Sequence, residues 1–165
     1  MNRAIRWTPL VLCAVFAACS DPAPKEDPAP AADTRRDDLR EAALRWTMKE
    51  AGDDIVRLHI DAKAWYIELE GDIDPADVFL ARFKDASPPV RKGSLCHVPD
   101  KVKDKATGET GVLFRIDSIE WDGGKTATVT ASFLHGNQGG SGYTLEIAEE
   151  DSRWVVRSGR NDRKF

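Results

Sequence analysis

The sequence predicts an α+β domain in which helices from the N-terminal half pack against a curved antiparallel sheet formed mainly by the C-terminal half. Three observations support this fold class. Apolar residues recur at helical spacing between residues 39 and 46, several segments after residue 111 alternate apolar with polar residues, and a glycine-containing turn separates the first two of these segments. We place this single domain at residues 34–159.

The first helix is expected over residues 34–52. Thr34 and Asp37 form a capping pattern at its start, and Gly52 is expected to end it. The apolar residues between them follow at intervals of three and four: Leu39, Ala42, Ala43 and Trp46. This spacing gives the helix one buried face.

Two strands and a second helix are expected next. Apolar residues alternate with polar ones over residues 56–60 and again over 65–69, which predicts a hairpin. Asp74 followed by Pro75 marks the start of a helix that ends before Pro88 and Pro89. Residues 90–98 have a weaker pattern, for which we expect a short strand.

The C-terminal half predicts a four-stranded antiparallel meander. Its first strand covers residues 112–121, with a change of phase between Ile116 and Ile119 that indicates a β-bulge. Residues 122–125 form the turn into a strand that alternates threonine with apolar residues. A flexible glycine-rich loop is expected over residues 136–142, followed by strands over 143–147 and 154–156.

This order of elements, together with the Trp154 and Val155 pair in the last strand, resembles the NTF2-like and cystatin-like folds of small bacterial exported domains. The resemblance covers residues 37–159 and implies a cone-shaped sheet that could enclose a pocket. The aromatic residues that would line it are Trp46, Trp65, Phe114, Phe133 and Trp154. Packing in a closed core explains the same residues equally well.

The first residues of the chain predict a signal peptide over residues 1–18. Arg3 and Arg6 form a basic start, and residues 7–18 are almost wholly apolar. As a helix, this stretch would span about 18 Å, whereas the bilayer hydrocarbon is roughly 30 Å thick. A membrane-spanning anchor is therefore not expected.

The end of the apolar stretch resembles the lipobox of bacterial lipoproteins, in the order Phe16, Ala17, Ala18 and Cys19, with Phe16 where leucine is commonest. The resemblance implies cleavage before Cys19 and attachment of fatty acyl chains such as palmitate to it. Two or three acyl chains anchor a protein stably in a membrane. The alternative is an ordinary secretory signal cut after Ala18, which would leave Cys19 as an exposed thiol.

Residues 19–33 are expected to form a disordered tether rich in proline and alanine. They contain no large apolar residue, so they cannot contribute to a core. Extended proline-rich chain of this length reaches roughly 40 Å from the bilayer. Ser20 favours the periplasmic side of the outer membrane, while Asp21 leaves the inner membrane open.

Charge and cysteine content exclude several classes of function. Removing residues 1–18 removes two arginines and no acid, so the net charge changes from −4 to −6. We therefore expect no nucleic-acid binding, which needs a basic face. With Cys13 removed and Cys19 acylated, Cys96 has no disulfide partner and is expected to be a small buried residue.

No motif for catalysis, a cofactor or a metal stands out. Cys96 and His97 are adjacent, so a strand would direct their side chains to opposite faces and prevent a dyad. Lysines interrupt the acidic series Asp100, Asp104 and Glu109, which favours a solvated loop over a cation site. Residues 160–165 are expected to form a basic, solvated tail.

The sequence is consistent with two functions. The favoured one is a membrane-tethered, non-catalytic domain that binds an envelope protein or a small apolar ligand. The alternative is an envelope enzyme of the isomerase or hydrolase type, because NTF2-like sheets also host Asp-His pairs inside the cone. In that case His59 with Asp61, or His135, would be the groups to test.

Overall fold

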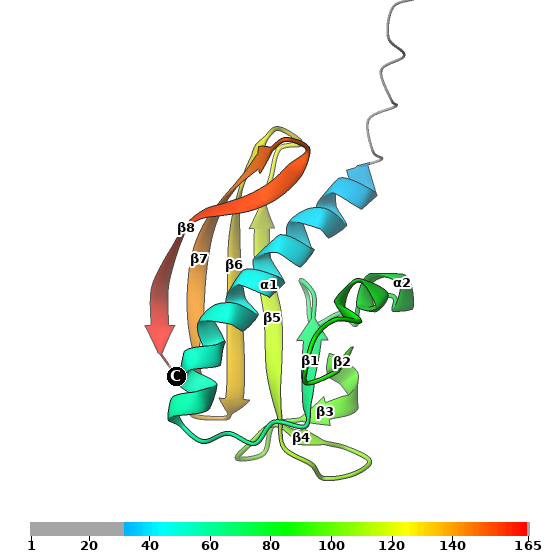
Figure 1. Cartoon of the computed structure of the whole chain (residues 1–165), viewed down its shortest axis with the longest axis vertical. Coiled ribbons are helices and arrows are strands. Elements are labelled where there is room, and N and C mark those ends of the chain that lie inside the picture. The colour runs from blue at the N-terminus through cyan, green and yellow to red at the C-terminus, as the bar shows by residue number, and fades with distance from the viewer. Residues whose placement is uncertain (1–31, 165) are drawn as a thin grey trace, which may run out of the picture.

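The computed structural model describes residues 32–164, in which a long helix crosses one face of a six-stranded mixed sheet (Figure 1). The strand order is β2-β1-β5-β6-β7-β8, and a separate two-stranded sheet contains β3 and β4. The α+β fold class is thus confirmed. The signal peptide, Cys19 and the tether up to residue 31 lie outside the described residues.

Helix α1, Ala32–Arg57, is longer at both ends than expected. It continues through Gly52, where an added Cβ would meet nothing within 4 Å. The helix ends at Arg57, and His59 in the turn that follows has a positive φ of 53°. The predicted strand over residues 56–60 is therefore wrong. Its alternation came from Val56 and Leu58, whose side chains are 76% and 45% exposed and belong to no buried face.

Strand β1, Ala64–Glu68, forms where expected but pairs differently. Instead of a hairpin it makes parallel ladders with β2, Val90–Lys92, on one side and with β5 on the other. The connection from β1 to β2 contains α2, Asp77–Leu80, which continues into the 3-10 helix η1, Ala81–Phe83. The second predicted helix is thus present, although it begins two residues after Pro75.

The segment after β2 covers part of the sheet's back face. It consists of the 3-10 helix η2, Gly93–Leu95, and the short antiparallel strands β3, Cys96–His97, and β4, Lys103–Asp104. The single strand expected over residues 90–98 is therefore divided into two. A small second core lies beneath this cover, formed by Ala64, Tyr66, Cys96, Val102 and Leu113.

The predicted antiparallel meander is confirmed. Its strands are β5, Gly111–Glu120, β6, Thr126–Gly136, β7, Gly139–Glu150, and β8, Arg153–Lys164. The register between β5 and β6 shifts between Ile116 and Ser118, which is where the change of phase predicted a bulge. Strand β8 continues past Gly159 to Lys164, so the sheet extends into the region expected to be a basic tail.

The glycine-rich segment is mostly strand, which corrects the expected flexible loop. Strands β6 and β7 pair down to Gly136 and Gly139, so only two residues form the turn. An added Cβ at Gly140 would lie 2.1 Å from the Phe133 carbonyl oxygen, and one at Gly136 would lie 2.3 Å from that of Asp100. The glycines therefore allow close backbone approach rather than flexibility.

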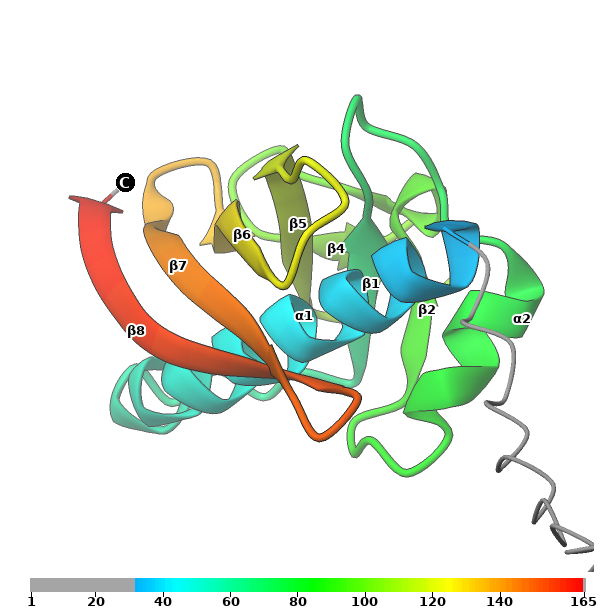
Figure 2. The same ribbon diagram turned by 90° about the horizontal axis from the view of Figure 1, so that it is seen from above.

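The main core lies between α1 and the meander. Figure 2 shows β7 and β8 curling around α1, and the helix contributes Leu39, Ala43 and Leu44, each fully buried. Phe114 and Phe133 lie opposite in the same core. Within residues 32–164 we find no helix that combines the length and the apolar character needed to cross a membrane.

Candidate functional site

One stripe of α1 lines two adjoining hollows on the protein's surface. Its residues follow at helical spacing, so they lie on one side of the helix: Asp38, Glu41, Ala42, Arg45, Met48 and Lys49. Arg45 lines both hollows, so they lie next to each other along α1, and we call the two together the α1 groove.

The walls of the α1 groove come from distant parts of the chain. The first hollow measures about 240 Å³, and its wall opposite α1 is formed by Trp65, Ala86 and Ser87. The second measures about 390 Å³ and is closed by the β7–β8 turn, through Ser152, Arg153 and Trp154. The indole N–H of Trp65 is buried and has no acceptor among the described residues.

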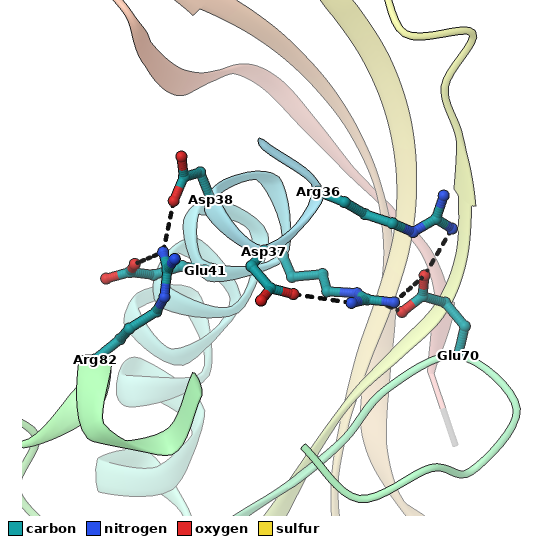
Figure 3. A network of polar contacts seen from close by, with 7 residues as sticks. Arg36, Asp37, Asp38, Glu41, Glu70 and Arg82 are labelled. Carbon is teal, nitrogen blue, oxygen red and sulfur yellow. Dashed lines mark hydrogen bonds and ion pairs between the residues drawn. The ribbon is translucent and has the colours of Figure 1, made fainter. Parts of the chain in front are cut away.

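Ion pairs fix the charged side chains that line the groove. Arg82 of η1 contacts Asp38 at 2.6 Å and Glu41 at 3.1 Å (Figure 3). Arg45 contacts Glu41 at 2.8 Å and Asp85 at 3.0 Å, and donates a hydrogen bond to the Arg82 carbonyl oxygen. This alternation of charges connects α1 to the segment after α2 and holds the side chains in defined positions.

These ion pairs favour the charged forms of Arg45, Asp85 and Arg82. The hydrogen bond to Asp85, together with that to Glu41, raises the pKa of Arg45, and the same contact with Arg45 lowers the pKa of Asp85. The hydrogen bond to Asp38 raises the pKa of Arg82 despite its partial burial. Both guanidinium groups also lie over aromatic rings, Arg45 at 5.0 Å from the ring centre of Phe83.

A second set of ion pairs flanks α1 on the side of the β1–α2 loop. Arg36 and Arg40 contact Glu70 at 2.9 and 3.0 Å, and Arg40 also contacts Asp37 (Figure 3). Burial would raise the pKa of Glu70, but the hydrogen bonds from Arg40 and Arg36 outweigh it, so this pKa is lowered. This flank fixes the start of α1 and lines neither hollow of the groove.

The five aromatic residues predicted to line a pocket are not gathered around one hollow. Phe114 and Phe133 are 0% and 1% exposed within the main core. Trp46 packs edge-on against Tyr143, at 5.3 Å between ring centres. Only Trp65 and Trp154 line the α1 groove, one in each hollow.

The residues of the enzyme alternative are also dispersed. His59 is exposed in the turn after α1, and Asp61 pairs with Lys63 at 2.7 Å. His135 is half-buried, and this burial lowers its pKa, while the charge of Asp54 acts in the opposite direction. The carboxylate whose charge acts on the pKa of His135 is thus that of Asp54 and not that of Asp61.

Cys96 is buried, as expected, and its environment makes it unreactive. Burial, with the nearby charge of Glu68, raises the pKa of its thiol to about 11. The neighbouring His97 is exposed, so the two side chains do not meet. A thiol that stays protonated at neutral pH is a poor nucleophile.

Asp104 is not the solvated loop residue that its surroundings in the sequence predicted. It is 4% exposed and accepts hydrogen bonds from the Tyr66 hydroxyl at 2.7 Å and from Arg91 at 2.9 Å. Its other oxygen accepts the backbone N–H groups of Ala106 and Thr107. Across residues 32–164, no group of three or more histidine, cysteine or acidic side chains is placed to hold a metal.

A larger hollow of about 660 Å³ lies at the turn end of β5, β6 and β7. Its lining includes the core residues Ala127 and Ile147 as well as Glu120, Thr128 and Glu146. Ladders of ion pairs like those of the α1 groove do not connect these residues among the described part of the chain. We therefore place the candidate site in the α1 groove, and this open face of the sheet serves as a control surface in the experiments below.

Sequence reasoning missed the charged residues of the α1 groove. Their signal was present, because Asp38, Glu41 and Arg45 follow at the same spacing as the apolar face of α1. A charged stripe of this kind is usually only a solvated helix surface. Its contact with η1 and with the β7–β8 turn depends on tertiary structure, which this spacing does not encode.

Comparison of the chain with models of protein families, with curated proteins and with solved structures finds no match.

Proposed function

We propose that the protein is a lipoprotein anchored through Cys19 on the periplasmic side of the cell envelope, with the outer membrane favoured. Its domain binds an acidic segment of another envelope protein along the α1 groove and catalyses no reaction. The observation that carries this proposal is the groove itself, in which paired charges and aromatic walls from three parts of the chain converge on one helix face.

The size of the two hollows favours a polypeptide partner. Pockets that enclose small molecules usually measure about 300–1,000 Å³ and are largely apolar. The first hollow of the α1 groove, at about 240 Å³, is below this range, the second, at about 390 Å³, is near its lower limit, and charged residues line part of both. Each can receive one or two side chains of a bound segment, which suits a protein partner better than a small apolar ligand.

The unpaired charges of the groove favour acidic side chains on that partner. Lys49 lines the first hollow and Arg153 the second, and neither forms an ion pair with a described residue. The indole ring of Trp65 forms an apolar wall of the first hollow. Complementary charge at such positions mainly determines partner choice and association rate.

Charge reversal of the groove tests the proposal. The Lys49→Glu and Arg153→Glu double variant should reduce recovery of the partner about tenfold or more when the full-length protein is purified from membranes after mild cross-linking. The matched control reverses Lys125 and Arg160, which are exposed outside the groove, and should leave recovery unchanged. Equal recovery with both double variants would count against the groove as the binding surface.

The enzyme alternative is supported only by the half-buried position of His135, whose pKa the charge of Asp54 raises against the effect of burial. Replacing His59 and His135 together tests it. An isomerase or hydrolase would lose all activity in this variant, whereas the binding function should be unaffected because neither histidine lines the α1 groove.

A further inference from the structure

The side chain of Arg35, in the first turns of α1, is enclosed by two tryptophans of the sheet. Its guanidinium carbon lies 5.2 Å from the ring centre of Trp121 and 5.7 Å from that of Trp154. The two rings meet edge to face, at 88° and with 5.8 Å between their centres. Two aromatic faces thus offer negative potential to a single cation.

Three oxygen acceptors complete the enclosure around the guanidinium. Arg35 Nη1 donates to the carbonyl oxygen of Gly123, and Nη2 donates to that of Gly124, both at 3.0 Å. Nη2 also contacts a carboxylate oxygen of Glu149 at 2.7 Å. These acceptors suit the planar fork of a guanidinium, whereas a compact ammonium group on a flexible stem would not reach all three.

The turn that supplies Trp121 and the two carbonyl acceptors has hydrogen bonds that do not involve Arg35. The indole N–H of Trp121 donates to the Gly124 carbonyl oxygen at 3.0 Å, and the Gly124 N–H donates to Asp122 at 2.8 Å. The N–H of Glu149 donates to the Lys125 carbonyl oxygen at 2.8 Å. These bonds order the β5–β6 turn and attach it to the end of β7, so the carbonyl acceptors and Trp121 keep their positions when Arg35 is replaced.

The position of Arg35 in the helix is unfavourable by itself. The N-terminal end of a helix carries partial positive charge, so a cation there is destabilising unless it is engaged elsewhere. Arg35 lies only three residues after the first residue of α1. A residue that is unfavourable for its local helix position but is stabilised by specific tertiary contacts is typical of a functional or binding position.

We propose that Trp121, Trp154 and Glu149 form a guanidinium-binding site, which Arg35 fills as a built-in ligand. Without Arg35 the site accepts an alkylguanidinium, such as the arginine side chain of another polypeptide. Because Arg35 is covalently attached, its effective concentration is in the millimolar range and it keeps external ligands out. The site would hold a guanidinium whether or not the α1 groove binds a partner.

Chemical rescue of Arg35→Ala in the full-length protein tests this site. The variant should melt about 3–6 °C below the wild type, and methylguanidinium at 1–20 mM (roughly the effective concentration of a tethered ligand) should restore part of that loss and saturate. Methylammonium at the same concentrations should restore less, because it lacks the fork. The wild type, whose site is filled, should not respond.

Arg153→Ala is the control, because Arg153 is an exposed arginine of the β7–β8 hairpin that forms no ion pair with Glu149 and no cation–π contact with Trp121 or Trp154. It should show no response to methylguanidinium. An Arg35→Ala variant without a saturable response, or an equal response in Arg153→Ala or the wild type, would overturn the proposal.

A second variant keeps the site testable if Arg35→Ala fails to fold. Arg35→Lys retains the charge and most of the stem, yet it should melt below the wild type because an ammonium cannot serve all three acceptors. In a Trp154→Leu background, Arg35→Lys should lower the melting temperature much less, since part of the site is already lost. Equal melting temperatures of Arg35→Lys and the wild type would contradict a guanidinium-specific site.

Discussion

Asp104 anchors the cover on the back of the sheet through a single buried carboxylate. The hydrogen bond from Tyr66 and those from the backbone of Thr107 and Ala106 lower its pKa, because each of them favours the charged form. Its pKa in the unfolded chain is about 3.9. Asp104 therefore stabilises the fold above about pH 4, and this contribution is lost as the pH falls from there towards its lowered native pKa.

Replacing Asp104 by asparagine should consequently have a pH-dependent effect. Near pH 7, Asp104→Asn should lower the melting temperature by about 5 °C or more, because Arg91 loses its charged partner and one oxygen loses its acceptor role. Below pH 4 the difference from the wild type should shrink. Thermal unfolding followed by circular dichroism between pH 2 and 8 measures both.

Asp100→Asn is the control for this experiment, because Asp100 is exposed and its carboxylate accepts a hydrogen bond only from the N–H of the next residue. It should follow the wild type at every pH. A constant gap between Asp104→Asn and the wild type down to pH 2 would show that the carboxylate charge contributes nothing.

Two glycines test the positions of α1 and β8. Gly52 lies inside α1 with nothing near its missing Cβ, so Gly52→Ala should raise the free energy of unfolding by about 0.5–1 kcal/mol. Gly159 faces Trp46, and an added Cβ would lie 2.3 Å from the indole ring. Gly159→Ala should therefore lower the free energy of unfolding by about 1–3 kcal/mol.

Urea unfolding of the two variants measures these opposite signs. If Gly52→Ala were destabilising, α1 would end at Gly52, as the sequence alone predicted. If Gly159→Ala were neutral, β8 would not pack against Trp46.

Elements with strong local signals, and the pairing of strands that follow each other directly, could be predicted from the sequence. The pairing of strands far apart in the chain could not. The meander was predictable because β5 and β6 alternate regularly around a glycine turn, and the bulge after Ile116 is visible as a change of phase. The parallel pairing of β1 with β2 and β5 was not, because residues far apart in the chain determine it. Near residue 56, the short alternation of apolar and polar residues does not distinguish the end of a helix from a strand.

The same distinction applies to the candidate site. Trp65 and Trp154 were predicted to line one pocket inside a cone-shaped sheet, whereas in the structure each lines a different hollow of the α1 groove. Phe114 and Phe133 have the same aromatic chemistry but are buried in the core beneath α1. Which aromatic residue reaches the surface depends on how the helix crosses the sheet, and no local pattern records that.

At the scale of the whole molecule, the proposed lipid anchor determines where the domain acts. Cys19→Ala should abolish labelling of the protein by a radioactive fatty acid and move it from the membrane to the soluble fraction. Its melting temperature should not change, because the described core begins beyond this residue.

Cys13→Ala is the matched control for the anchor, since Cys13 lies within the predicted signal peptide and should not affect labelling. Label that persists in Cys19→Ala would exclude acylation at this cysteine. A wild-type protein that takes up no label would instead indicate an ordinary secretory signal.

Site-specific photo-cross-linking in intact cells tests the proposed binding function most directly. A photoreactive residue at Ala42, in the α1 groove, should give one discrete adduct with an envelope protein, and the Lys49→Glu and Arg153→Glu double variant should abolish it. The same residue at Thr128, on the open face of the sheet, should give none. An adduct from Thr128 but not from Ala42 would contradict the assignment of the α1 groove as the binding surface.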